Sequence, residues 1–123
     1  MAESKILIVE DEVLPALELQ FILKGLGYAV QTSTNGEEAV LLAGEENPDI
    51  VLMDISIDGE MDGIQTADNI GLGLGIPIIF MTGYSDEEVI EKAKHINPVA
   101  ILSKPLDMHI LKSVIKSAIE KTT

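Results

Sequence analysis

Side chains able to bind a metal ion or a phosphoryl group stand directly after, or close behind, short apolar runs of this chain. They are Glu10, Asp11, Asp54, Thr82 and Lys104. Carboxylates are hard oxygen ligands that suit Mg²⁺ better than zinc or copper. A lysine ammonium can meet a phosphoryl oxygen as a point charge, and a threonine supplies one hydroxyl donor. With such neighbours a carboxylate could act as a nucleophile toward phosphorus and form an aspartyl phosphate.

The apolar runs predict how these side chains are brought together. They cover residues 6–9, 50–53, 78–81 and 99–102. Runs this short and apolar are typical of strands buried on both faces of a parallel sheet, and ligand sites in such sheets lie past the carboxyl ends of the strands. Each polar residue alone has an ordinary explanation as a helix cap, a turn residue or a solvated lysine. Four strand ends with compatible groups favour a single site.

Segments of helical period alternate with the apolar runs, which is the pattern of an α/β domain. We expect strands near 5–9, 28–32, 49–53, 77–81 and 99–102. We expect helices near 12–25, 36–46, 62–71, 86–95 and 107–120. Capping signals mark three helix starts, at Thr34 with Glu37, at Ser85 with Glu88, and at Asp107. The length of 123 residues allows one domain with a hydrophobic core, so residues 1–123 are expected to form a single domain.

Composition narrows the class of function. The net charge is −13, with eight lysines and no arginine, so direct binding to nucleic acid is disfavoured. The acidic residues either solvate the surface or, where they cluster, favour a divalent cation. No apolar run approaches the ~20 residues that cross a bilayer, and no secretory signal is visible. The absence of cysteine fits a cytosolic protein.

The first predicted helix is apolar on two sides. One set of side chains should face the sheet, namely Leu19, Ile22, Leu23 and Leu26. A second set lies on roughly the opposite side, namely Leu14, Leu17 and Phe21. Such a helix is either buried all round or covers a partner surface, and an outer helix of a small domain favours a partner-docking stripe.

In their order and spacing these motifs resemble those of the receiver domains of two-component response regulators. The matching segments are 6–12, 51–54, 61–63, 78–83 and 103–105. The resemblance spans nearly the whole chain. It implies a flavodoxin-like (βα)5 fold with a doubly wound parallel sheet in strand order 2-1-3-4-5.

The resemblance also implies roles for the site residues. Asp54 would be the phosphoacceptor, with Asp11, Asp54 and the backbone carbonyl of Ser56 on Mg²⁺. Glu10 would act on the metal mainly through a bound water. Lys104 and Thr82 would bind the phosphoryl group. The Lys104–Pro105 peptide bond is expected to be cis.

Ile101 and the segment 55–60 depart from the family pattern, and Tyr84 and Ser56 suggest a further detail. Ile101 stands where the family usually has an aromatic switch residue, so Thr82 would move against an aliphatic side chain. The segment 55–60 lacks the usual proline and is one residue longer. By the same resemblance Tyr84 and Ser56 flank the route of the hydrolytic water. We therefore expect Tyr84 to shield the acyl phosphate, so that Tyr84→Ala would shorten its lifetime.

These observations predict a cytosolic phosphoacceptor domain that is a switch and not an enzyme, although it promotes its own phosphorylation and hydrolysis. The phosphodonor would be a histidine kinase or a phosphotransfer protein docking on Leu14, Leu17 and Phe21. An output domain, partner or second copy would use the face of the fourth helix, fifth strand and fifth helix. Two alternatives stay open: a receiver-like interaction module that is never phosphorylated, and a Mg²⁺-dependent phosphatase. The phosphatase is disfavoured because Ser56 stands where a second acid/base Asp would be needed.

Overall fold

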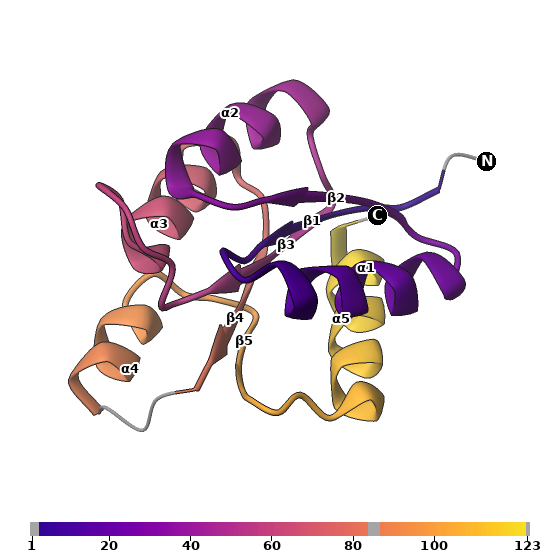
Figure 1. The fold of residues 1–123 in the computed structure, drawn as a ribbon. Helices are drawn as coiled ribbons and strands as arrows, with labels where there is room; N and C mark the ends of the chain where they lie inside the picture. Colours follow the sequence, from indigo (N-terminus) through magenta and orange to yellow (C-terminus); the bar gives the residue numbers. More distant parts are fainter. Residues whose placement is uncertain (1–2, 84–86, 123) are drawn as a thin grey trace.

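A computed structural model describes residues 3–83 and 87–122. The strands are β1 (Lys5–Val9), β2 (Ala29–Ser33), β3 (Ile50–Asp54), β4 (Ile78–Thr82) and β5 (Ala100–Ser103). The helices are α1 (Val13–Gly25), α2 (Gly36–Glu46), α3 (Gly63–Leu74), α4 (Glu87–Lys94) and α5 (Met108–Thr122). The five strands are parallel and lie in the order β2-β1-β3-β4-β5, which confirms the predicted α/β fold (Figure 1).

Helices cover both faces of the sheet and divide the core into two clusters. Alternate residues of β1 and β3 pack on opposite faces, as the period of a strand requires. Leu7, Val9, Val51 and Met53 pack with α2, α3 and α4. Ile6, Ile8, Ile50 and Leu52 pack with α1 and α5. Figure 1 shows α1 and α5 together on one side of the sheet and the other three helices on the opposite side.

The observed boundaries refine the predicted ones. β3 and β4 each extend one residue further than expected, so that Asp54 and Thr82 are the last residues of their strands. α3 ends three residues later than expected, at Leu74, where Gly75 adopts a left-handed backbone with φ of 70°. Glycine takes that conformation without the steric cost of a side chain.

One capping prediction was confirmed and one was wrong. Asp107 accepts hydrogen bonds from the amides of His109 (2.9 Å) and Ile110 (3.3 Å) at the start of α5. For α2 the N-cap is Asn35 and not Thr34, because the Asn35 side chain accepts from the Glu38 amide at 2.8 Å. Ser85 and Tyr84 lie outside the described residues.

The prediction for α1 was correct for its outer side and partly wrong for its inner side. Leu19 and Leu23 are buried against the sheet, whereas Ile22 and Leu26 are exposed. Ala16 takes part of the inner face instead. The predicted outer stripe of Leu14, Leu17 and Phe21 is exposed to solvent. Among the described residues, no helix is long and apolar enough to span a membrane.

Candidate functional site

The carboxyl ends of β1, β3 and β4 bring acidic and hydroxyl groups to one edge of the sheet, as the sequence predicted. Asp54 ends β3 and is only 2% exposed, and Glu10, just after β1, is 1% exposed. The Lys104 ammonium follows β5 and lies between them. Its Nζ donates to Asp54 Oδ2 at 2.9 Å and to Glu10 Oε1 at 3.1 Å. Buried carboxylates need such a partner, because an unpaired charge in this position would be strongly destabilising.

Asp11 completes a cluster with the donor chemistry of a magnesium site. One carboxylate oxygen from each of Glu10, Asp11 and Asp54 lies within 4.8 Å of the others. Three hard oxygen donors gathered at this spacing fit Mg²⁺, which accepts carboxylates and keeps several waters. Asp11 is only partly buried, so the cluster opens toward solvent on its side.

The loop between β3 and α3 supplies hydrogen-bond donors to the same carboxylates. The Ser56 amide and the Ser56 hydroxyl both donate to Asp54 Oδ1, at 2.9 and 2.8 Å. The Asp58 amide donates to Asp11 Oδ2 at 3.1 Å. Gly63 begins α3 directly against the Asp54 carbonyl, where a side chain would clash with the backbone. β3 and the loop are therefore packed tightly together.

Thr82 and Lys104 are placed by the pairing of β4 with β5. Thr82 is paired with Ser103 and is buried at the end of β4. The Lys104 amide donates to the Thr82 carbonyl at 2.8 Å, which ties the two segments together. The Lys104–Pro105 peptide bond is cis, as predicted. Ile101 is partly buried and packs against the core cluster on the side of α2, α3 and α4.

Burial and pairing shift the pKa values of these groups in different directions. Burial, with the hydrogen bond and charge of Asp54 as further causes, raises the pKa of Glu10 to about 7 in spite of Lys104, which opposes the shift. Burial alone would raise the pKa of Asp54, but hydrogen bonds from Glu10, Lys104 and Ser56 outweigh it and hold that pKa below its usual range. Burial disfavours the Lys104 cation, yet its pairing with Asp54 and Glu10 raises its pKa. Without a metal ion, Glu10 is therefore the carboxyl that keeps a proton and Asp54 the one that stays ionised.

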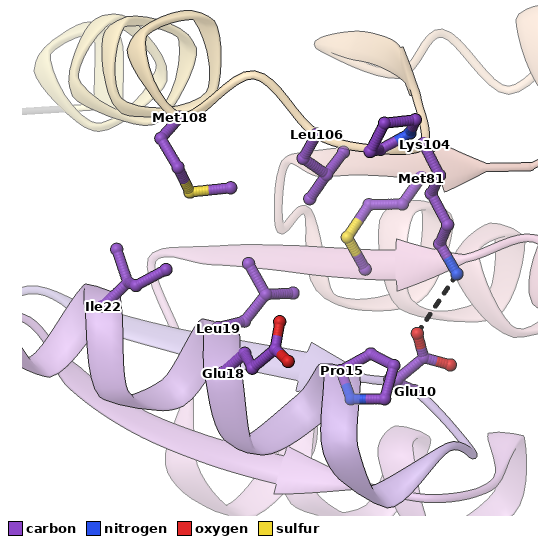
Figure 2. A pocket seen from close by; sticks show the side chains of 10 residues that line it. Glu10, Pro15, Glu18, Leu19, Ile22, Met81, Lys104, Leu106 and Met108 are labelled. Carbon is purple, nitrogen blue, oxygen red and sulfur yellow. Dashed lines mark hydrogen bonds and ion pairs between the residues drawn. The ribbon is translucent and has the colours of Figure 1, made fainter.

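A groove of about 260 Å³ leads from α1 to the acidic site. Figure 2 shows α1 on one side of it, with Pro15, Leu19 and Ile22, and Leu106 and Met108 on the other. Lys104 and Glu10 lie together at one end, where their ion pair is drawn. The groove wall is largely apolar, and this apolar surface leads to the charged Glu10 and Lys104.

This arrangement can be compared with known proteins. The family model described as the response regulator receiver domain matches residues 6–116. The chain belongs to this family. The receiver is 36% identical over 118 residues to the transcriptional regulatory protein ZraR of Escherichia coli, covering 95% of this chain and 26% of ZraR. It is 31% identical over 117 residues to sporulation initiation phosphotransferase F of Bacillus subtilis, covering 94% of each protein.

The fold agrees with solved structures as well. The signal receiver domain of a modulated diguanylate cyclase from Desulfovibrio desulfuricans is 42% identical, with a TM-score of 0.91, and the match covers 98% of this receiver and 96% of that chain. This receiver spans about a quarter of ZraR, the first relative named above.

Every predicted site residue lies at this edge of the sheet, but two contacts of the site were not anticipated. The metal-binding role of the Ser56 backbone carbonyl stays a prediction, and in addition the Ser56 amide and hydroxyl donate to the Asp54 carboxylate. The pattern Asp-x-Ser could have suggested such a local bond, because short polar side chains often bond two residues away. The bond from Asp58 to Asp11 joins positions 47 residues apart, and no local pattern signals it.

Proposed function

We propose that this cytosolic receiver accepts a phosphoryl group on Asp54 from a phosphohistidine, in a reaction that requires Mg²⁺. The observation that carries the proposal is the buried Asp54 carboxylate held between Lys104, Ser56 and two further carboxylates. Phosphoryl transfer depends mainly on positioning and charge neutralisation, and this arrangement offers both. The relative named sporulation initiation phosphotransferase F supports the same chemistry by its name.

In this reaction the P–N bond of phosphohistidine breaks and a P–O bond to an Asp54 oxygen forms. The imidazole nitrogen leaves with the electron pair. Asp54 starts ionised because its pKa is low, so no base is needed to activate it. Lys104 would move from the carboxylates to a phosphoryl oxygen, and the Thr82 hydroxyl would donate to another.

Magnesium would be held by Asp11, Asp54 and the Ser56 backbone carbonyl, with Glu10 acting on it through a bound water. The bound ion would neutralise charge on the carboxylates and on the transferred group. Hydrolysis would later return Asp54 and release inorganic phosphate, so the domain acts as a self-resetting switch and not as an enzyme with an external substrate.

The phosphodonor, a histidine kinase or phosphotransfer protein, would dock on α1. The exposed stripe of Leu14, Leu17 and Phe21 lies on the outer side of α1, and other residues of the same helix form one wall of the groove that leads to Lys104. With a chain net charge of −13, a partner with basic residues around an apolar patch is favoured. Phosphorylation would then alter contacts of an output domain, partner or second copy at the face of α4, β5 and α5.

Labelling with a small phosphodonor tests the proposal. Wild type and Asp54→Asn would be incubated with acetyl phosphate and Mg²⁺, and the intact mass measured over time. We expect wild type to gain one phosphoryl group and Asp54→Asn, or wild type with a chelator, to gain none. A wild-type chain that binds Mg²⁺ but does not label would favour the alternative of a receiver-like interaction module.

A further inference from the structure

We propose that Asp58 is a positioning residue for the cation site, acting through its backbone amide and not through its carboxylate. The inference rests on the cation site described above. It starts from the bond in which the Asp58 amide donates to Asp11 Oδ2 at 3.1 Å. Asp11 is the least buried carboxylate of the cluster, and so it is the one most in need of orientation by a second group.

The loop can hold Asp11 because it is itself fixed on both sides of Asp58. Ile55 and Ile57 are buried in the core cluster next to the sheet. Ser56, between them, bonds to Asp54 through its amide and its hydroxyl. Buried apolar residues therefore alternate along the loop with residues whose polar groups face the carboxylates. This alternation directs the Asp58 amide toward Asp11.

The far side of the loop is anchored as well. Gly59 has φ of 129°, a conformation that side-chain-bearing residues rarely adopt, and it turns the chain immediately after Asp58. The loop then ends in a capping box, in which Asp62 accepts from the Gln65 amide at 2.8 Å and Gln65 accepts from the Asp62 amide at 3.1 Å. An amide held between two such anchors loses little freedom when it bonds to Asp11.

The consequence is a preoriented ligand. By binding Oδ2, the amide fixes the rotation of the Asp11 carboxylate in the cluster with Glu10 and Asp54. Groups that hold a metal ligand in this way typically change metal affinity by about 10–100-fold when they are lost. The Asp58 carboxylate lies at an exposed position and has no part in the bond.

Two substitutions at one position separate the amide from the carboxylate. Asp58→Pro removes the N–H donor, whereas Asp58→Ala keeps it and removes the carboxylate. Binding of Mg²⁺ alone would be measured by titration calorimetry. We expect Asp58→Ala to bind much as wild type does, and Asp58→Pro to bind about tenfold more weakly or worse. Equal binding by all three, or equally weak binding by both variants, would overturn the proposal.

A measurement that leaves the loop sequence unchanged guards against misfolding of the proline variant. Amide hydrogen exchange would be followed by NMR in metal-free wild type and Asp11→Ala. The Asp58 amide should exchange faster in Asp11→Ala, while the Ile55 amide, which bonds to the Met81 carbonyl at 3.0 Å, should not change. Unchanged exchange at Asp58 would refute the contact. Failure of wild type to bind Mg²⁺ would instead refute the cation site, and failure of Asp54 to label would refute only the phosphoryl transfer.

Discussion

The raised pKa of Glu10 predicts that the metal-free receiver becomes less stable as the pH rises. An ordinary glutamate titrates near 4.5, while Glu10 in the fold keeps its proton up to about 7. Between these values the folded state binds more protons than the unfolded chain. The contribution of Glu10 to the free energy of unfolding is therefore largest below about pH 4.5 and is lost as the pH rises through about 7. Since one pKa unit corresponds to about 1.4 kcal/mol, the full effect is at most about 3 kcal/mol.

Urea unfolding followed by circular dichroism would measure this effect from about pH 5 to about pH 8 with a chelator present. Glu10→Gln is the control, because it keeps the size of the side chain and cannot titrate. The neighbours do not interfere in this window. The lowered pKa of Asp54 gives stability that is lost only below about 3.8, and the raised pKa of Lys104 gives stability that is lost only above 10.5.

Wild type should lose stability relative to Glu10→Gln by about 1–3 kcal/mol across the window. Magnesium should reverse the trend, because an ion that binds ionised carboxylates displaces the proton and binds more tightly at higher pH. Parallel stability curves for wild type and Glu10→Gln would refute the reasoning, since they would mean that Glu10 does not hold the proton.

Three further predictions concern other parts of the receiver. Lys104→Met should bind Mg²⁺ at least as tightly as wild type, because the competing Lys104 cation is gone. It should nevertheless accept a phosphoryl group about 10²-fold more slowly than wild type. Weaker Mg²⁺ binding by the variant in calorimetry would contradict this prediction. Gly63→Ala should lower the free energy of unfolding by about 1–3 kcal/mol, because a side chain there would meet the Asp54 carbonyl. Gly71→Ala in the same helix has open space around it and should not lower it. Equal urea midpoints for the two variants would contradict the close contact of Gly63 with β3. Phe21→Ser should slow transfer from a protein phosphodonor but not from acetyl phosphate. Leu72→Ser is the matched control, because Leu72 is 84% exposed and Phe21 is 83% exposed, and it should slow neither reaction. Equal rates of transfer from the protein phosphodonor to the two variants would exclude docking at Phe21.

The sequence was sufficient to predict the architecture and the edge of the sheet at which the predicted site residues lie. Short apolar runs identify buried parallel strands, and parallel strands necessarily present their carboxyl ends at one edge. This is why Asp54 and Thr82 could be placed together although they lie far apart in the chain. The misplaced cap of α2 has a local cause, because Thr34 and Asn35 are both good capping residues and only the backbone conformation selects Asn35.

Two kinds of contact could not be predicted. One kind depends on the path of a loop, and the other lies at the border of the buried face of a helix. Ile22 and Leu26 have the spacing of an inner face, but α1 rests on the sheet mainly through Ala16, Leu19 and Leu23. Ile22 lines the groove beside α5 instead. Periodicity reports the direction of a side chain around the helix axis and not how much of the helix is covered.

The β3–α3 loop also offers a way for the receiver to report the state of Asp54 without an aromatic residue at position 101. Ile101 has no polar tip that could follow a movement of Thr82. The loop, in contrast, contacts Asp54 through Ser56, and Ser56 also lines a hollow of about 260 Å³ shared with Val89 and Lys92 of α4. Within α4 only Ala93 is buried, so little packing opposes a shift of this helix. We therefore expect a change at Asp54 to reach α4 through the loop, with Ile101 as a passive packing contact.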